Sequence, residues 1–153
     1  MNGTQATEDY YTLKHLCMFT GLSDRTLRNY ISSGFLQGEK INGLWYFTPE
    51  QAEAFVAHPA VRPAILAKRN GVVYDFLAED KKKEEQVCLI LDFPGVDRRE
   101  LAEFFCCAIS NGDFRDFRFS LDGNRAAPRV ILKGPTAQVL GLVNRWYGRK
   151  TEA

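Results

Sequence analysis

Two short apolar segments near the N-terminus, each closed by a glycine, constrain the fold of this chain more than any other feature. Leu13, Leu16 and Cys17 recur at i, i+3 and i+4, the spacing of one helical face. Thr12 is suited to cap that helix. Gly21 is suited to end it, because glycine adopts positive φ without steric cost. The pattern predicts a short helix that stops at a tight turn.

A second segment repeats this arrangement directly after the turn. Ser23 is suited to cap a second helix and Gly34 to end it. Leu27, Tyr30 and Ile31 supply its apolar face at the same spacing. Two helices across a short glycine-containing turn are the sequence outline of a helix-turn-helix.

The second helix presents a polar face opposite its apolar one. At about 100° per residue, Arg25, Asn29 and Ser32 point away from the apolar side chains. Thr26 and Arg28 lie on the flanks. Such side chains bond phosphate oxygens and base edges in a major groove, so this face predicts DNA contact. The competing interpretation is an ordinary solvated helix surface.

A β-hairpin is predicted next in the chain. Asn42-Gly43 is a type I′ turn signal between two extended runs, residues 36–41 and 44–47. Pro49 then stands at the first position of a third helix, where its missing N–H costs nothing. A helix-turn-helix followed by such a hairpin has the outline of a winged helix.

These segments resemble the MerR family of bacterial winged-helix regulators over about a third of the chain. The matching residues are Tyr11-Thr12-Leu13, Thr20-Gly21-Leu22-Ser23, Arg25-Thr26-Leu27-Arg28-Asn29-Tyr30, Gly34-Phe35-Leu36, Asn42-Gly43 and Tyr46-Phe47-Thr48. Carried over by position, the resemblance implies that four residues face DNA or brace the recognition helix. They are Arg25, Thr26, Arg28 and Tyr30.

The hairpin departs from the family pattern. Trp45 and Tyr46 stand where the family usually carries arginines, which leaves Lys40 as the only base of the wing. We predict a DNA-binding set drawn from the second helix and the wing. Its members are Ser23, Arg25, Thr26, Arg28, Asn29, Tyr30, Lys40, Trp45 and Tyr46.

The charge balance predicts weak DNA binding by a single copy. The formal net charge is +1, and residues 1–60 hold four basic against six acidic side chains, a net charge of −2. Nucleic-acid-binding modules are usually more basic, because neutralised phosphates supply most of their affinity. We therefore expect a homodimer that binds double-stranded DNA through two modules.

The sequence is typical of a soluble cytoplasmic protein. The four cysteines, Cys17, Cys88, Cys106 and Cys107, form no C-x-x-C pair, as expected in a reducing compartment. No apolar run approaches the roughly 18 residues of a membrane span, and residues 1–9 are too polar for a signal peptide. We expect residues 1–9 to be disordered and expect no membrane partner.

The chain is predicted to hold a winged helix-turn-helix domain at residues 10–58, a connecting helix and hinge at 59–85, and a second domain at 86–150. The helix is expected over about residues 60–82. Two heptad-spaced pairs lie in it, Ile65 with Val72 and Leu66 with Val73. The family resemblance implies dimerisation through an antiparallel helix at this place. The alternative is a helix packed on its own domains.

The second domain reads as α+β. An almost continuous apolar run at residues 87–93 predicts a buried central strand. The other elements follow in order: a helix capped by Asp97, a strand at 117–122, a returning strand with Val130 and Leu132, and a helix after Gly134-Pro135. This β-α-β-β-α order is an incomplete ferredoxin-like plan that lacks its final strand. One sheet edge is then open, which invites pairing with a second copy.

Enzymatic motifs are absent from the sequence. It contains no phosphate loop and no G-x-S-x-G. His15 and His58 lack a ligand partner at metal-site spacing and are interpreted as structural or surface residues. Cys106 and Cys107 point about 140° and 240° from Leu101 around a helix, off its apolar stripe, which suits oligomer packing better than one shared ion. We expect no enzymatic activity and no bound metal or cofactor. The alternative is that the two cysteines sense a metal or an oxidant.

Together these observations predict an α+β, DNA-binding transcriptional regulator that acts as a homodimer. Two alternatives keep the same module. One is a winged-helix protein-interaction or scaffolding protein that does not bind DNA, and the other is an architectural protein similar to excisionases. The sequence identifies no small-molecule effector.

Overall fold

The computed structural model describes residues 10–123 and 125–151 of the 153-residue chain. The described chain is α+β, as predicted. It divides into two compact units between Arg69 and Asn70, within a single helix. The predicted disordered segment, residues 1–9, lies outside the described residues.

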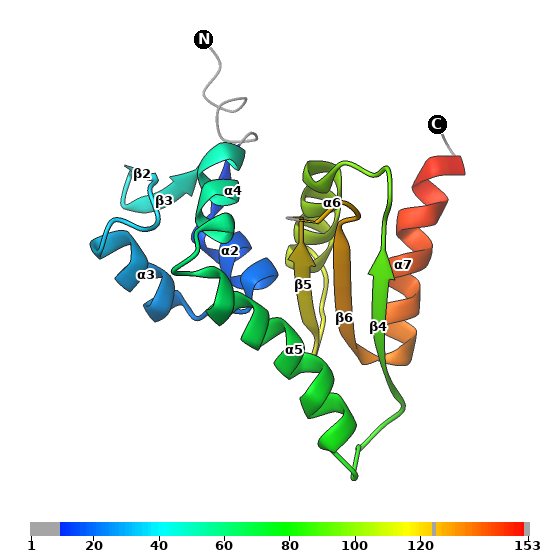
Figure 1. Cartoon of the computed structure of the whole chain (residues 1–153). Helices are drawn as coiled ribbons and strands as arrows, with labels where there is room; N and C mark the ends of the chain where they lie inside the picture. Colours follow the sequence, from blue (N-terminus) through cyan, green and yellow to red (C-terminus); the bar gives the residue numbers. More distant parts are fainter. Residues whose placement is uncertain (1–9, 124, 152–153) are drawn as a thin grey trace. The chain divides into compact units, whose positions relative to one another are not determined.

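The first unit begins with the two helices and the hairpin that the sequence predicts (Figure 1). Its elements are β1 (Tyr11–Thr12), α2 (Leu13–Thr20), α3 (Asp24–Ser32), β2 (Glu39–Ile41), β3 (Leu44–Phe47), α4 (Pro49–Ala57) and the start of α5 (Arg62–Ala78). The Thr12 hydroxyl accepts the His15 N–H at 3.2 Å, and His15 Nδ1 accepts the Thr12 N–H at 3.1 Å. Gly21 ends α2 with a φ of 79°, as predicted.

Reciprocal capping recurs at the start of α4. The Thr48 hydroxyl accepts the Gln51 N–H at 3.0 Å, and the Gln51 carboxamide accepts the Thr48 N–H at 2.9 Å. Pro49 occupies the first turn, as predicted. The connecting helix predicted over about residues 60–82 is present as α5, shorter at both ends, and continues through Gly71.

The first sheet has the order β1-β3-β2, and both pairs of strands are antiparallel. The turn has φ values of 51° at Asn42 and 81° at Gly43, which confirms the type I′ prediction. The sequence did not predict β1, because two residues are too few to show an alternating pattern. β1 exists because Tyr11 pairs with Phe47 across the sheet.

A shared apolar core holds the short helices of the first unit. Its fully buried members are Leu16, Leu27, Leu36, Phe47, Phe55, Val61 and Ile65. Val56, the neighbour of Phe55 in α4, is only half-buried. Helices of eight and nine residues, such as α2 and α3, are marginal alone, so tertiary packing stabilises them.

The second unit has the predicted β-α-β-β-α order. Its elements after α5 are β4 (Gln86–Asp92), α6 (Arg98–Ser110), β5 (Arg118–Asp122), β6 (Arg129–Pro135) and α7 (Thr136–Thr151). The strands lie in the order β4-β6-β5, each antiparallel to its neighbour. Asp97 caps α6, as predicted, by accepting the Arg99 N–H at 3.1 Å.

The prediction of a buried central strand at residues 87–93 is wrong. β6 is the central strand, and β4 lies at the edge, where all seven of its residues keep some exposure. The apolar run serves two faces: Leu89 shares one face with Leu132, and Ile90 shares the other with Ile131. Among the described residues no strand corresponds to the final strand of the four-stranded plan, which would lie outside β4, so β4 pairs on one side only.

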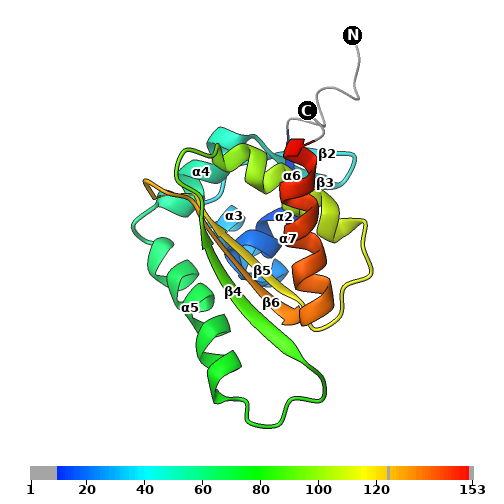
Figure 2. The ribbon, with the colours of Figure 1, turned by 90° about the vertical axis from the view of Figure 1, so that its right-hand side faces the viewer.

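Aromatic side chains form the core of the second unit. The Phe105 ring of α6 stacks on Phe119 of β5 at 5.5 Å and on Trp146 of α7 at 6.0 Å between centroids. Phe93 and Phe104 meet Trp146 edge-on at 5.8 and 5.3 Å. Both helices therefore cover the face of the sheet that carries Phe119. Helix α7 runs along this sheet in both views (Figures 1 and 2).

Candidate nucleic-acid interface

The outer face of α3 has the orientation that the sequence predicts. Leu27 is fully buried, whereas Arg25, Arg28 and Asn29 are exposed. Ser32 is exposed on the same face. Four polar side chains therefore face solvent along a helix of nine residues, enough to reach several base pairs of a groove.

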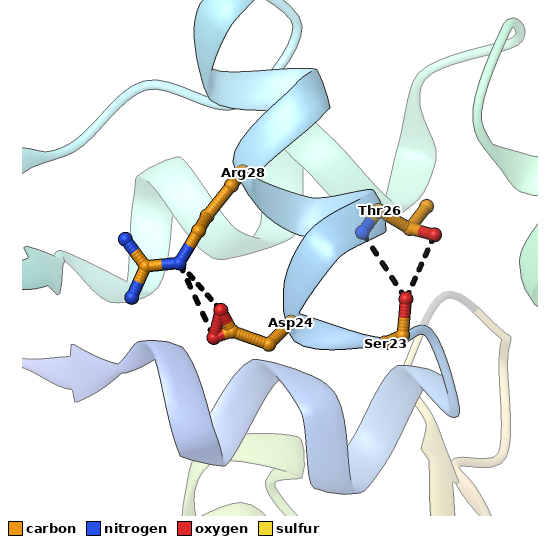
Figure 3. A network of polar contacts seen from close by, with 4 residues as sticks. All are labelled: Ser23, Asp24, Thr26 and Arg28. Atoms are coloured by element: carbon orange, nitrogen blue, oxygen red, sulfur yellow. Dashed lines mark hydrogen bonds and ion pairs between the residues drawn. The ribbon is translucent and has the colours of Figure 1, made fainter.

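The first turn of α3 is closed by local hydrogen bonds (Figure 3). Ser23 Oγ accepts the Thr26 N–H at 3.1 Å and donates to Thr26 Oγ1 at 2.9 Å. These bonds hold both side chains in the cap. The positive end of the helix dipole lies at this turn and favours an anion, but Asp24 already supplies one.

Arg28 is a predicted site residue whose positive charge is partly balanced by a neighbouring carboxylate. Its Nε donates to the Asp24 carboxylate one turn earlier in α3 (Figure 3). The side chains are 57% and 54% exposed, so this pair adds little stability and is easily exchanged for another partner. Arg25, by contrast, has no hydrogen bond or ion pair within residues 10–123 and 125–151. It is the most available cation of α3.

Tyr30 packs inward rather than projecting from the outer face of α3. Its ring meets Phe55 at 5.4 Å and Phe35 at 6.1 Å, both edge-on. Of the two roles that the MerR resemblance implies for this residue, the geometry fits bracing of the helix.

The two aromatic residues predicted for the hairpin are also packed rather than free. Trp45 stacks near Phe47 at 6.4 Å, Tyr46 meets Tyr10 edge-on at 6.2 Å, and both are half-buried. The Lys40 ammonium lies 5.8 Å from the centre of the Trp45 ring. Lys40 therefore remains the exposed cation of β2, steadied by an aromatic face.

The tip of the hairpin is apolar, which the sequence analysis missed. Ile41 and Leu44 pair directly across the turn and are 36% and 62% exposed. The signal was present in the sequence, because residues that flank a two-residue I′ turn are held at the tip of the hairpin. An apolar tip does not bind phosphates.

A shallow cleft of about 510 Å³ lies between the end of α3 and α4. Phe35, Phe55 and His58 line it with Glu50 and Gln51, and none of its lining residues belongs to the predicted DNA-binding set. The His58 ring meets Phe35 at 4.8 Å, and its Nδ1 accepts the Ala60 N–H at 3.0 Å. His58 thus serves as a local cap.

The two adjacent cysteines of α6 occupy different environments. Cys106 is 3% exposed, so its expected position off the buried stripe is wrong. Ala102, one turn earlier, is also buried, and the buried face of α6 is therefore wider than its large side chains indicate. Burial, then the neighbouring Cys107 thiol, raises the pKa of Cys106 to about 12. Cys107 is exposed, and no group of three metal-ligating side chains occurs in the described parts of the chain.

Comparisons with profiles of known protein families, with curated proteins and with solved structures found no match. The likeness to MerR regulators therefore rests on the residues of the first unit alone. Among the helices that the structure describes, none combines the length and apolar character that a membrane span requires.

Proposed function

We propose that this chain is a DNA-binding transcriptional regulator that acts as a homodimer through a MerR-like winged helix-turn-helix formed by α2, α3 and the β2–β3 hairpin. The observation that carries the proposal is the outer face of α3. It exposes Arg25, Asn29 and Ser32 on a capped helix whose opposite side is anchored by the buried Leu27. A rigid helix with that polar set suits a major groove.

The candidate site divides into base-reading and phosphate-binding parts. Arg25 lies near the start of α3 without a local partner among the described residues, so it is the candidate for a base edge. Arg28 and Lys40 are the candidates for phosphates, Arg28 after it leaves Asp24. Three cations per copy make weak binding, which two copies on half-sites about 10 base pairs apart would strengthen.

Selection of preferred sites from random double-stranded DNA tests the proposal. Arg25→Ala should weaken binding to the selected site by about 1–3 kcal/mol and relax its sequence preference. Lys40→Ala should weaken all sequences alike and reduce the salt slope by about one unit. Arg115→Ala, which removes an exposed arginine of the second unit, is the matched control and should change neither. No enriched site, with equal weak binding by wild type and Arg25→Ala, would overturn DNA binding.

A protein-interaction module without DNA binding is the second candidate function. The exposed tip residues Ile41 and Leu44, and the net charge of −2 over residues 1–60, favour it. In that case Leu44→Lys should abolish capture of a protein partner. If the hairpin instead approaches a phosphate backbone, the same substitution adds a cation and should strengthen DNA binding.

A further inference from the structure

The outer edge of β4 is a long apolar strand edge without a partner strand among the described residues. β4 pairs with β6 on one side only. Its five middle residues, 87–91, include neither a charge nor a proline. Proteins usually protect a free strand edge with charges, proline or short length. The opposite edge strand, β5, is shorter and carries Arg118 and Asp122 at its ends.

Helix α7 is attached to α6 along one side only. Gln138 Nε2 donates to the Asp113 carbonyl, in the segment after α6, at 3.0 Å. Arg149 Nη2 donates to Glu100 of α6 at 2.6 Å. At about 100° per residue, both side chains lie about 60–80° to one side of the buried Trp146. That side of α7 therefore faces α6.

The other side of α7 is apolar and uncovered. Leu140 and Tyr147 lie about 100–120° from Trp146 in the opposite sense, away from α6, and are 45% and 51% exposed. Because α7 contacts β4 and β6, this side lies over the free edge of the sheet. Ile90 of β4 is also 51% exposed, on the face of the sheet opposite α7. Outside α5, these three residues are all of the exposed large hydrophobic side chains in the described part of the second unit.

We propose that a second copy of this chain pairs with β4, strand to strand and antiparallel, to form one continuous six-stranded sheet. This names the interface of the homodimer, and so rests on that part of the proposed function but not on DNA binding. Each copy supplies the strand that its partner lacks at this edge. The α7 helices then come side by side, and their Leu140 and Tyr147 side chains cover one another.

The register of the pairing follows from the length and charge of β4. A two-fold axis perpendicular to the sheet keeps the two helix-covered faces on one side, and placed at Leu89 it pairs all seven residues of β4. Asp92 then lies opposite Gln86 of the other copy. Moving the axis to Cys88 shortens the overlap and brings Asp92 opposite Glu84 of the other copy, which is repulsive. The axis at Leu89 is therefore favoured.

This register makes a specific prediction for disulfide formation. It places Ile90 opposite Cys88 of the other copy, where Cβ atoms of cross-strand pairs are about 4.5–5.5 Å apart. In a full-length Cys107→Ser background, which removes the exposed native thiol, Ile90→Cys should cross-link with oxidised glutathione. The oxidant takes up two electrons and two protons per disulfide and becomes reduced glutathione. The product should run at twice the 17.4 kDa protomer mass and disappear when Cys88→Ser is added.

Two further measurements complete the test. Leu140→Glu with Tyr147→Glu should weaken dimerisation at least tenfold in analytical ultracentrifugation, and circular dichroism should confirm that this double variant folds.

Leu77→Cys is the matched control for the Ile90→Cys cross-link, because Leu77 is 72% exposed on α5. Efficient cross-linking through Leu77→Cys and none through Ile90→Cys would place the interface on α5 and overturn the proposal. A wild-type protein that stays monomeric at tens of micromolar would also overturn the proposal. So would a β4 edge that binds a foreign β-strand peptide but no second copy of this chain. Loss of DNA binding with the dimer intact would leave this interface standing.

Discussion

In the first unit the outer strand β2 is three residues long and exposes Glu39 and Lys40, whereas β4 in the second unit extends over seven residues without a charge between its ends. Both strands lie at the edge of a three-stranded antiparallel sheet. The short charged edge is protected from pairing and remains available to solvent or phosphate. The long apolar edge is suited to receive another strand. Sheets of the same size thus support opposite kinds of surface.

The two units also differ in what their helices expose. Helix α3 turns polar side chains outward and its one large buried anchor, Leu27, inward. Helix α7 exposes Leu140 and Tyr147 on one side while Trp146 enters the core. We infer that the two units have separate roles: the first unit contacts a polar ligand, and the second unit contacts another copy of the chain. Three perturbations test how separate these roles are.

The largest effect should come from Phe55→Ala, which removes a fully buried ring from the first core. Loss of a buried Phe costs about 3–5 kcal/mol, a large part of the stability of a small unit. Each unit contains one tryptophan, Trp45 in the first and Trp146 in the second, so single-tryptophan variants report on each separately. Denaturant titration should show a lower midpoint for Trp45 and an unchanged midpoint for Trp146.

Phe105→Ala is the matched control in the second unit, where Phe105 is equally buried. It should shift the Trp146 midpoint and leave that of Trp45 in place. If both signals move together in either variant, the units unfold as one, and the proposed separation is wrong.

A smaller effect is expected from Asp24→Asn, which releases Arg28 from its ion pair and removes a negative charge at the start of α3. If the outer face of α3 binds phosphates, DNA affinity should rise by up to about tenfold, and the salt slope should steepen by about one unit. Fluorescence anisotropy with a labelled duplex at two salt concentrations measures both. Glu103→Gln, an exposed acid of the second unit, should have no such effect. An unchanged slope would exclude Arg28 from the phosphate contacts.

The smallest effect concerns pH. Burial, and then Lys14, lowers the pKa of His15 below its ordinary value of 6.5. Because the folded state favours the neutral ring, whose Nδ1 accepts the Thr12 N–H, this stability is present above pH 6.5 and is lost as pH falls through the lowered pKa. The Trp45 denaturation midpoint should therefore be lower at pH 5 than at pH 7.

The second unit should respond only in stronger acid. A hydrogen bond from Arg129 lowers the pKa of Asp92 below its ordinary 3.8, so the stability from this exposed pair is lost only as pH falls below that value. His15→Gln should flatten the response of the first unit between pH 7 and 5, because a carboxamide keeps the acceptor, as Gln51 does in α4. A pH response that survives His15→Gln would assign it to another group.

Most of the first unit was predictable because its signals are local. Thr12, Ser23 and Gly21 act on the backbone within a few residues, and the cap or turn forms wherever the chain places it. Asn42-Gly43 likewise determined its own turn. Of the candidate site, the outward orientation of Arg25 and Asn29 followed from helical periodicity alone.

The rest depended on tertiary packing or on a choice among several possible side-chain partners. The inward packing of Tyr30 requires Phe55, and the pairing of Arg28 with Asp24 was one of several choices open to an exposed arginine. Cys106 is buried because the whole side of α6 that holds Ala102 packs inward, which a stripe of large residues did not indicate.

The sequence by itself determined the caps, the turns, the order of the elements and the polar face of α3, since each depends on interactions across only a few residues. Only the tertiary structure decided that β4 is an edge strand. An apolar run is expected both in a central strand and in an edge strand that awaits a partner. The two cases differ in which strand lies in the middle of the sheet. Here the middle strand is β6, which begins more than 35 residues after the end of β4.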